Sequence, residues 1–300
     1  MIEVAAAVIQ RPDGRFLLAQ RPTGKVYAGY WEFPGGKIEP GEPAEGALAR
    51  ELHEELGMDV RVAYPWIRRE HVYPHGHVGL NFFRVLEWSG EPHPREDQAI
   101  AWQALGAAMV APMLPANAPV LASLALPHEY AVTDAARLGT AEMLARLERR
   151  LESGLRLLQI REPGLDAPSR ELFTSEALGL AHRHACKVLV KTPHASADGV
   201  HYTAAELMRL ERRPNAGLAA ASCHTRHELE RAMQLALDFA VVGPVLEKGA
   251  AEPLGWQKFA DLVRGTSVPV YAIGGLKPAD MSDAWRAGAH GLAMIRGSWG

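Results

Sequence analysis

Short apolar runs recur roughly every 20 to 30 residues through the second half of the chain, and amphipathic stretches separate them. The runs lie at 130–133, 155–160, 187–190, 199–202, 218–222, 239–243, 268–273 and 291–295. A strand of a parallel sheet is buried on both faces, so it reads as continuous apolar sequence, and parallel pairing needs helical crossovers. Eight such units predict a closed (β/α)8 TIM barrel. A doubly wound sheet would give a similar alternation, but the even spacing and the lack of an obvious switch point favour the barrel.

The first part of the chain has a different pattern, in which strand-like runs and turns surround one strong helix. Residues 2–10 and 15–19 are β-type runs separated by the turn sequence Pro-Asp-Gly-Arg, which predicts a hairpin. Further along we expect a helix over 43–56, a second strand pair over 67–73 and 78–87, and a helix or irregular cap over 105–126. The change of pattern predicts two α/β domains, residues 1–126 and 127–300.

Composition limits the kinds of protein that this chain can be. Of its 300 residues 48% are hydrophobic and 22% are charged, which is typical of a globular protein with a sizeable core. The near balance of 32 Lys+Arg against 35 Asp+Glu argues against stable binding of nucleic acid or of an anionic membrane. Two cysteines are too few for a disulfide framework, and no apolar run reaches the roughly 18 residues that span a bilayer. We therefore expect a cytoplasmic protein with no membrane partner.

Three glutamates crowd one side of the predicted helix 43–56. At 3.6 residues per turn, Glu51, Glu54 and Glu55 form a stripe beside the apolar stripe of the helix. Like charges four residues apart destabilise a helix by about 0.2 to 0.5 kcal/mol per pair, and the helix dipole disfavours anions near the C-terminal end. A charge run of this kind is most often a solvated helix face. Arg50 is the one cation in the helix, so we expect a hard divalent cation with oxygen ligands to compensate the remaining charge.

The surroundings of these glutamates resemble the Nudix box. The segment 35–58 satisfies every fixed position of that box: Gly, five residues, Glu, seven residues, Arg-Glu-Leu, one residue, Glu-Glu, one residue, Gly-Met. The resemblance to Nudix pyrophosphohydrolases covers residues 1–126 and implies an α/β/α sandwich. It also implies a loop–helix–loop that binds Mg²⁺ or Mn²⁺ and hydrolyses a nucleoside diphosphate linked to another group. An ion pair between Arg50 and Glu42 would fix the loop to the helix.

The Nudix resemblance implies a role for each remaining polar position. Glu54 and Glu55 would be metal ligands together with the carbonyl of Gly35. Glu51 would be either a further ligand or the base that activates the attacking water, and the sequence leaves both open. Carboxylates around a divalent cation suit this reaction, because hydrolysis of a phosphoanhydride needs charge neutralised on the diphosphate and a positioned water.

Three further segments resemble the MutT-type branch of the family, which removes oxidised guanine nucleotides. They are Gln-Arg-Pro at 20–22, Trp-Glu-Phe-Pro-Gly-Gly at 31–36 and Pro-Ala-Asn-Ala-Pro at 115–119. The resemblance implies hydrolysis of the nucleoside triphosphate 8-oxo-dGTP to 8-oxo-dGMP and pyrophosphate. The alternatives are another nucleotide, a damaged pyrimidine or a thiamin pyrophosphate-related substrate, or a non-enzymatic ligand-binding or regulatory protein with a relic box.

The MutT resemblance also implies which residues contact the substrate. Arg21 would contact a nucleotide phosphate, and Phe33 would line the base pocket. Asn117 would hydrogen-bond the purine edge, for which its amide offers both a donor and an acceptor. An Asn between two prolines is also an ordinary turn residue. Glu96 would be a further metal ligand or base.

From about residue 129 the chain resembles thiamin-phosphate synthase and its relative, the thiazole tautomerase. The matching segments include Tyr-Ala-Val-Thr-Asp at 130–134, Gln-Ile-Arg-Glu at 159–162, Ala-Ser-Cys-His-Thr at 221–225 and Ala-Ile-Gly-Gly-Leu at 272–276. All lie at the ends of predicted strands, where the active sites of such barrels are built. The candidate site residues of the barrel are Gln159, Arg161, His224, Gly274, Gly275, Gly297 and Ser298.

The barrel half departs from the synthase pattern at several positions. The synthase carries a Lys where this chain has Pro163, and an Asn-Asp pair for Mg²⁺-pyrophosphate where this chain has Lys191 and Thr192. His224 stands where the tautomerase has its catalytic histidine, so proton-transfer chemistry stays open. The loss of the metal carboxylate predicts a barrel without synthase activity.

The glycines after the last two predicted strands suggest a different use for the barrel. Gly274 and Gly275 follow the seventh strand, and Gly297 and Ser298 follow the eighth. Backbone N–H groups at these two places cradle phosphate in many barrels, although glycines there also serve tight turns alone. We expect either a site for a phosphorylated ligand or a barrel that only supports the first domain.

Overall fold

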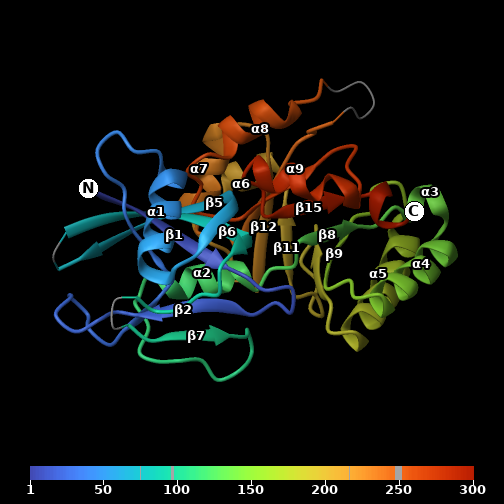
Figure 1. The fold of residues 1–300 in the computed structure, drawn as a ribbon. Coiled ribbons are helices and arrows are strands. Elements are labelled where there is room, and N and C mark those ends of the chain that lie inside the picture. The colour runs from blue at the N-terminus through green and yellow to red at the C-terminus, as the bar shows by residue number, and fades with distance from the viewer. Residues whose placement is uncertain (75, 96–97, 216, 247–251) are drawn as a thin grey trace. The chain divides into compact units, whose positions relative to one another are not determined.

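The computed structural model describes residues 1–300 except 75, 96–97, 216 and 247–251 (Figure 1). The chain divides into two units, Met1–Ala125 and Leu126–Gly300. Each unit has its own clusters of buried apolar side chains and therefore its own hydrophobic core. No helix in the described part of the chain is long and apolar enough to cross a membrane.

The first unit consists of two sheets and two helices. Its elements are β1 (Ile2–Ile9), β2 (Phe16–Gln20), β3 (Trp31–Glu32), β4 (Gly35–Lys37), α1 (Ala44–Leu56), β5 (Asp59–Tyr73), β6 (Gly76–Ser89), β7 (Ile100–Gln103) and α2 (Asn117–Leu124). The larger sheet has the order β4-β1-β6-β5 and the smaller one β3-β2-β7. In the larger sheet β1 and β6 are parallel, while β4 and β5 run antiparallel to their neighbours.

The predicted hairpin between residues 2–10 and 15–19 is wrong. Both runs form strands, but β1 belongs to the larger sheet and β2 to the smaller one. Within the described residues one bridge, between Gln10 and Phe16, connects the two runs before they diverge. The physical reason is that β6 pairs with one edge of β1 along its whole length and β4 pairs with the other edge, so these long-range pairings leave no edge of β1 for β2.

Helices cover both sides of the two sheets. Alternate side chains of β1 enter different cores: Ala5 lies in a cluster with Leu52 of α1, and Ala6 lies in a cluster with Val120 of α2. Because successive side chains of a strand point to opposite faces, the sheets are packed between the two helices. The predicted α/β/α sandwich is confirmed.

Helix α1 confirms the helix predicted over residues 43–56. Pro43 precedes its first residue, and Gly57 ends it with a φ of 67°, donating its backbone N–H to the carbonyl of His53. A side chain at this left-handed position would be strained, so glycine is the natural stop. The apolar stripe of the helix is fully buried and consists of Ala47, Leu48, Leu52 and Leu56.

The other predictions for the first unit are confirmed in part. The second strand pair exists as β5 and β6, is longer than expected, and has Tyr73 paired with Gly76 at its tip. Of the predicted segment 105–126, only Asn117–Leu124 is a helix, and residues 104–116 are mostly irregular.

The second unit is a closed barrel of eight parallel strands in the order β10-β11-β12-β13-β14-β15-β8-β9. Its elements are β8 (Glu129–Val132), α3 (Ala135–Leu138), α4 (Thr140–Glu152), β9 (Leu157–Ile160), α5 (Ala167–Arg183), β10 (Lys187–Val190), β11 (Gly199–Tyr202), α6 (Ala204–Arg209), β12 (Leu218–Cys223), α7 (Arg226–Gln234), β13 (Phe239–Val242), α8 (Gly255–Val263), β14 (Val270–Ile273), η1 (Pro278–Asp280), α9 (Met281–Arg286), β15 (Gly291–Met294) and η2 (Arg296–Ser298). Each of the eight apolar runs overlaps one of these strands, so the predicted barrel is confirmed.

One crossover of the barrel differs from the predicted alternation of strand and helix. Residues 191–198, all of them described, connect β10 to β11 through turns without a helix. The two strands are nevertheless parallel neighbours. A barrel with a shortened third crossover needs fewer residues than one with eight full helical units.

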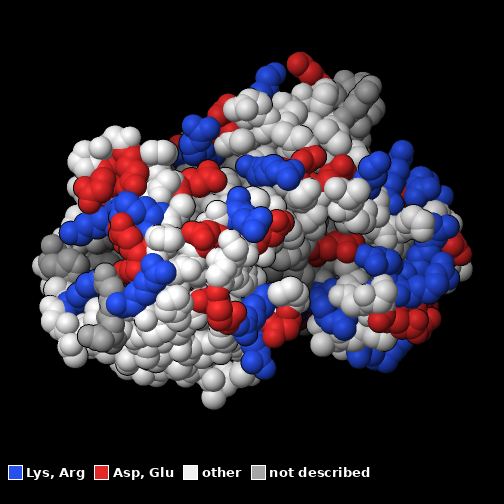
Figure 2. Space-filling view, in the orientation of Figure 1, with Lys and Arg blue, Asp and Glu red and all other residues white. Residues whose placement is uncertain are grey.

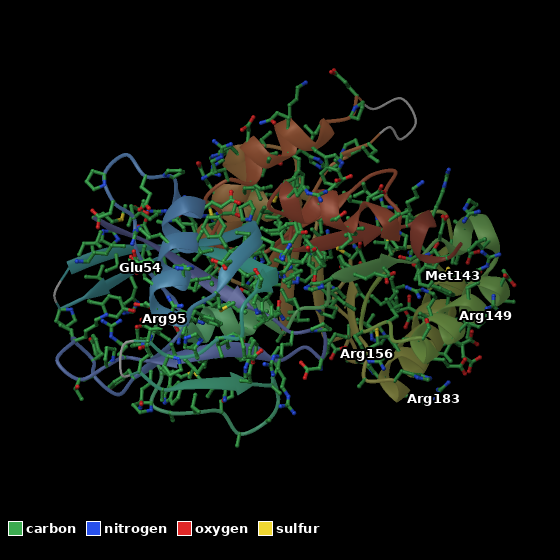
Figure 3. The ribbon with its side chains drawn as sticks, in the orientation of Figure 1. Glu54, Arg95, Met143, Arg149, Arg156 and Arg183 are labelled. Carbon is green, nitrogen blue, oxygen red and sulfur yellow. The ribbon has the colours of Figure 1, made fainter. Side chains whose placement is uncertain are left out.

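Three aromatic side chains pack together inside the barrel among aliphatic ones such as Leu157 and Leu189. The ring of Phe239 lies 5.0 Å from that of Tyr130 and 5.0 Å from that of Tyr271. Outside the barrel, α4 buries Met143 completely and leaves the side chain of Arg149 64% exposed; both are labelled in Figure 3. The strand ends above this filled interior are the places where a ligand can bind.

Candidate functional site

The first unit contains a cavity of about 640 Å³. It is bounded by the loop after β2, by β3 and β4, by α1, by β6 and by the start of α2. The structure brings six of the predicted site residues to its wall, namely Arg21, Phe33, Gly35, Glu51, Glu55 and Asn117. The cavity has the size of pockets that hold drug-sized or nucleotide-sized ligands.

The three glutamates of α1 point in two directions. Glu51 and Glu55 line the cavity, and their side chains are 17% and 16% exposed. The Glu51 carboxyl group packs on Gly36, where an added Cβ would lie 2.0 Å from its Cδ atom. Glu54, labelled in Figure 3, is 57% exposed and is not part of the cavity wall. The spacing of four residues therefore directs Glu51 and Glu55 to the same cavity, while Glu54 faces solvent.

Cationic side chains compensate part of this negative charge. Arg50 Nη1 lies 2.8 Å from Glu51 Oε1 and 3.5 Å from Glu54 Oε2. Hydrogen bonds from Arg50 to Glu42, and then to Glu51, raise the pKa of the guanidinium further above its usual value. From the loop after β2, the Lys25 ammonium approaches Glu55 Oε1 at 4.0 Å. The predicted Arg50–Glu42 ion pair is confirmed, whereas Lys25 is a partner that the sequence did not reveal.

The donor set fits a hard divalent cation, although it is not assembled as a metal site. Among the described residues, no three His, Cys, Asp or Glu side chains lie close enough to hold a metal ion together. Glu51 and Glu55 nevertheless present carboxylate oxygens to the cavity that Gly35 also lines, and Mg²⁺ and Mn²⁺ prefer oxygen donors. Glycine is required at position 35, because a Cβ there would lie 2.1 Å from the Ala5 carbonyl oxygen. Glu96 lies outside the described residues.

The cavity wall also contains aromatic and amide groups. Phe33 is 4% exposed, and its ring lies 5.9 Å from that of Phe16 and 5.8 Å from that of Phe82. Asn117 is 3% exposed, and its Nδ2 donates to the Trp31 carbonyl at 3.0 Å. The amide thus fixes strand β3 and also borders the cavity, at the first residue of α2. Its contact with a purine edge stays a prediction.

Arg21 is held in place by an ion pair that the sequence did not predict. Its Nη1 donates to Glu32 Oε1 at 2.6 Å and to Oε2 at 2.8 Å, and its Nε donates to the Val26 carbonyl at 2.7 Å. Burial raises the pKa of Glu32, and the attraction of Arg21 opposes that rise. A carboxylate between Trp31 and Phe33 was the available signal, because a charge in a buried strand needs a partner.

The barrel residues expected to bind phosphate lie in the loops after β14 and β15, and they could offer mainly backbone groups to a ligand. Gly275 has a φ of 66°, a conformation natural for glycine. A Cβ on Gly297 would lie 2.4 Å from the Leu276 carbonyl oxygen, so the loops after β14 and β15 are in contact. Ser298 is buried, and its hydroxyl donates to Glu129 Oε1 at 2.9 Å. Its side chain therefore supports β8, and a ligand at this place would meet backbone groups.

The remaining barrel candidates have partners of their own, and the barrel also contains a buried hydrogen-bond network that the sequence did not predict. Gln159 is buried, the Arg161 backbone N–H donates to Thr133, and His224 Nδ1 lies 3.0 Å from the Gly243 carbonyl. At the centre, His201 hydrogen-bonds through Nδ1 to Tyr130 at 3.0 Å and through Nε2 to Ser222 at 2.9 Å. This network belongs to the list of functional candidates because it joins three polar side chains inside the barrel.

Burial lowers the pKa of His201 to about 4, so its imidazole is neutral at physiological pH. In the neutral ring one nitrogen donates and the other accepts, so one of the two hydroxyl groups accepts a hydrogen bond from the ring and the other donates one to it. Its signal in the sequence was the alternation of His201 with apolar residues in the run 199–202.

The first unit is an α/β/α sandwich with two carboxylates facing a cavity, and the second is a closed parallel barrel. The chain is therefore a fusion of a hydrolase-type unit and a barrel unit. Comparison with known families agrees with this division. A NUDIX domain model matches residues 5–123, and a model described as thiamine monophosphate synthase matches residues 129–297. The chain belongs to the Nudix hydrolases through its first unit and to the thiamine monophosphate synthase family through its second.

Individual relatives cover one unit each. The CTP pyrophosphohydrolase of Escherichia coli is 41% identical over 121 residues, 40% of this chain and 89% of that protein. The 8-oxo-dGTP diphosphatase of Haemophilus influenzae is 40% identical over 121 residues, with the same two shares. The solved thiamine phosphate pyrophosphorylase of Pyrococcus furiosus is 22% identical, covers 56% of this chain and 84% of its own, and has a TM-score of 0.46.

Proposed function

We propose that the first unit hydrolyses 8-oxo-dGTP to 8-oxo-dGMP and pyrophosphate with Mg²⁺ or Mn²⁺ as cofactor. The observation that carries this proposal is that Glu51 and Glu55 face the same cavity as Phe33 and Asn117. The cavity thus offers oxygen donors for a metal-bound phosphate chain together with an aromatic side chain and an amide for a purine. The relatives named 8-oxo-dGTP diphosphatase support this substrate.

The chemistry assigned to the residues follows from their positions. Water adds across one phosphoanhydride bond, the monophosphate and pyrophosphate separate, and a proton is released. A bound divalent cation would neutralise the phosphate oxygens, held by Glu55, the Gly35 carbonyl and Glu51, unless Glu51 acts as the base. Glu54 and Glu96 stay in the proposed set of ligands or bases.

Substrate contacts are assigned to three residues of the cavity wall. Arg21 is proposed to contact a phosphate, with its guanidinium kept in orientation by Glu32. Phe33 is proposed to line the base site, and Asn117 to read the purine edge through the part of its amide not used by Trp31. A pyrimidine triphosphate is the second candidate substrate, because the CTP pyrophosphohydrolase of E. coli shares 41% identity with this unit.

We propose that the barrel binds a phosphorylated ligand and lacks synthase activity. The contact between Gly297 and the Leu276 carbonyl supports a phosphate site, because it brings the loops after β14 and β15 together. Pro163, Lys191 and Thr192 argue against the synthase reaction, since the residues expected to hold Mg²⁺-pyrophosphate are replaced. A purely supporting barrel is the alternative.

The proposed partners are free nucleotides in the cytoplasm. Figure 2 shows acidic side chains next to basic ones on the visible face of each unit, and Lys and Arg gather over α3, α4 and α5 beside acidic groups. Such a mixture gives no continuous basic stripe for a nucleic-acid backbone on the visible face of either unit. Cys186 and Cys223 are buried free thiols, which suits a reducing compartment.

A panel assay tests these proposals on the full chain. Pyrophosphate release is measured for 8-oxo-dGTP, dGTP, CTP and dCTP, with and without Mg²⁺. Orthophosphate release is measured for thiamin pyrophosphate under the same conditions, because hydrolysis of its one phosphoanhydride bond gives thiamin phosphate and orthophosphate. We expect release that requires the metal and is fastest for 8-oxo-dGTP. Faster release from CTP or dCTP would favour the pyrimidine alternative, and no release from any compound would favour the non-enzymatic one.

A further inference from the structure

The loop after β2 is held in a defined shape at the cavity mouth. Its base is closed by the Arg21 N–H on the Tyr30 carbonyl at 2.8 Å and by the Gly29 N–H on the Arg21 carbonyl at 2.9 Å. At its tip Tyr27 has a φ of 61°, and its ring packs 5.3 Å from Tyr30 and 5.7 Å from Tyr73. A non-glycine residue in this conformation is strained and needs such support. The loop is therefore built to present particular side chains to the cavity.

Lys25 is the cation that this loop presents to α1. Its Nζ lies 4.0 Å from Glu55 Oε1, and Lys25 belongs to the cavity wall. The Lys25 side chain is 51% exposed, whereas that of Glu55 is 16% exposed. The flexible end of the pair is thus the lysine, and the carboxylate is the fixed end.

The two cations of this loop differ in exposure. The Arg21 side chain is 22% exposed and is bound by both oxygens of Glu32 and by the Val26 carbonyl. The Lys25 side chain is 51% exposed, and its ammonium lies 4.0 Å from Glu55 Oε1 on a four-carbon stem with freely rotating donors. A phosphate chain entering the cavity would attract both cations, and the ammonium can follow it by rotation about the lysine stem.

We infer that Lys25 exchanges partners when substrate binds: its ammonium neutralises Glu55 in the metal-free enzyme and moves to the phosphate oxygens when nucleotide and divalent cation enter. This inference rests on the proposed function. A cation that takes the Glu55 carboxylate repels the ammonium beside it, while the phosphate chain attracts the ammonium within the same cavity. Lys25 therefore acts as a substitute for the metal before binding and as a substrate contact after it.

The variant Lys25→Met separates these two effects because they have opposite signs. Mn²⁺ affinity of the full chain is measured without nucleotide, by calorimetry or by the electron paramagnetic resonance signal of free Mn²⁺. We expect Kd for Mn²⁺ to fall about two- to fivefold, because this factor corresponds to the free energy of an exposed ion pair. KM for the nucleotide should rise by about tenfold, as for a lost hydrogen bond to a charged group. Turnover at saturation should change by less than about twofold, because the contact is present in both ground and transition states.

Two further variants serve as controls. Lys25→Arg keeps the charge and should restore both values toward those of the wild type. Arg15→Met removes a positive charge that pairs with Asp13 at 3.6 Å on an exposed turn outside the cavity wall, and should leave both values unchanged. A merely structural role of Lys25 would weaken metal and nucleotide binding together.

The outcomes distinguish this inference from the proposed function. If the wild type hydrolyses nucleotides but Lys25→Met leaves Mn²⁺ affinity and KM unchanged, or weakens Mn²⁺ binding, the exchange of partners is refuted and the hydrolase stands. If the wild type neither binds Mn²⁺ nor hydrolyses any nucleotide, both are refuted. Tighter Mn²⁺ binding combined with a higher KM supports the exchange.

Discussion

Arg50 donates two hydrogen bonds to the Glu42 carboxylate, from Nε to Oε1 at 3.0 Å and from Nη2 to Oε2 at 3.0 Å. Glu42 lies in the loop before α1, so the pair fastens this loop to the helix that carries the cavity glutamates. The third nitrogen of the same guanidinium, Nη1, lies 2.8 Å from Glu51. A planar guanidinium can hold both carboxylates at once, which a lysine ammonium cannot do with the same geometry.

Replacement of Arg50 with Lys should therefore impair the reaction although it preserves the charge. We expect kcat to fall by about tenfold or more, because Glu51 loses the group that orients it and small misplacements are costly in catalysis. Steady-state kinetics at saturating Mg²⁺ provides the measurement. Wild-type kcat in Arg50→Lys would show that the net charge alone matters at this position.

The same pair makes a pH-dependent contribution to stability. Hydrogen bonds from Arg50 hold the pKa of Glu42 below its usual 4.5. A lowered carboxyl pKa stabilises the fold above the unfolded value of 4.5, and this contribution disappears as the pH falls through the folded value. Glu42→Gln should thus lower Tm at neutral pH, and the difference from the wild type should shrink below about pH 4.5. Calorimetric scans across this range test it, and a constant difference would contradict it.

The three glutamates of α1 should not be equivalent in catalysis. Glu51→Gln and Glu55→Gln each remove a charge from the cavity, so hydrolysis should fall by at least about 10²-fold, as for the loss of a key electrostatic group. Glu54→Gln should cost less, because its carboxylate is 57% exposed and outside the cavity wall. Turnover and circular dichroism are measured for all three variants. If Glu54→Gln gave the largest loss with an intact fold, our assignment of the cavity carboxylates would be wrong.

Asn117 should affect both specificity and stability. Asn117→Ala removes the amide at the proposed purine site and one of two donors to the buried Trp31 carbonyl, which keeps the Leu114 N–H at 3.1 Å. The loss of this hydrogen bond should cost about 0.5 to 1.5 kcal/mol. We expect a lower Tm and weaker discrimination between 8-oxo-dGTP and dGTP, with a smaller effect on pyrimidine triphosphates.

A neighbouring residue on α2 provides the control for Asn117. Ser123 is also buried on this helix, and its hydroxyl donates to Pro119 within the helix, away from the cavity wall. Ser123→Ala should lower Tm without changing discrimination. Equal losses for purine and pyrimidine triphosphates in Asn117→Ala would leave Asn117 with a structural role alone.

The predictions from sequence succeeded where one residue pattern determines one structure. Each buried parallel strand of the barrel reads as an apolar run, and the Nudix box spacing places Glu51 and Glu55 one turn apart on α1. The hairpin prediction failed because the turn at residues 11–14 is local, whereas the pairing of β1 with β6 is decided by residues about 75 positions away.

Contacts between side chains from distant segments could not be predicted. The contact of Lys25 with Glu55 depends on the loop that Tyr27 supports. The hydrogen bond of the Ser298 hydroxyl depends on Glu129, at the other end of the barrel sequence. Spacing along the chain contains no information about such partners. The sequence could therefore indicate the residue types of the site but not their charge balance.

Acid should destabilise the barrel through His201. Burial of the imidazole lowers its pKa in the folded protein from the usual 6.5 to about 4. Below pH 6.5 the unfolded chain takes up a proton that the folded chain does not, so stability falls as the pH drops from 6.5 toward 4. The loss amounts to at most about 3 kcal/mol at 1.36 kcal/mol per unit. The titration is followed by NMR of the histidine ring protons, with His201→Gln used for assignment, and a pKa near 6.5 would contradict this account.

The last prediction concerns the phosphate site proposed between the loops after β14 and β15. Gly275→Asp places a carboxylate and a strained φ of 66° at this site, so it should abolish binding of phosphate compounds and leave nucleotide hydrolysis unchanged. Calorimetry with inorganic phosphate, thiazole phosphate and thiamin phosphate reports binding, and a coupled assay reports thiamin phosphate synthesis. Gly154→Asp, at a φ of 103° in the turn before β9, is the control for strain and should keep binding. Appreciable synthesis by the wild type would refute the loss of synthase function, because Pro163, Lys191 and Thr192 would then suffice for it. A wild type that binds none of the three compounds would show that the barrel serves as a scaffold.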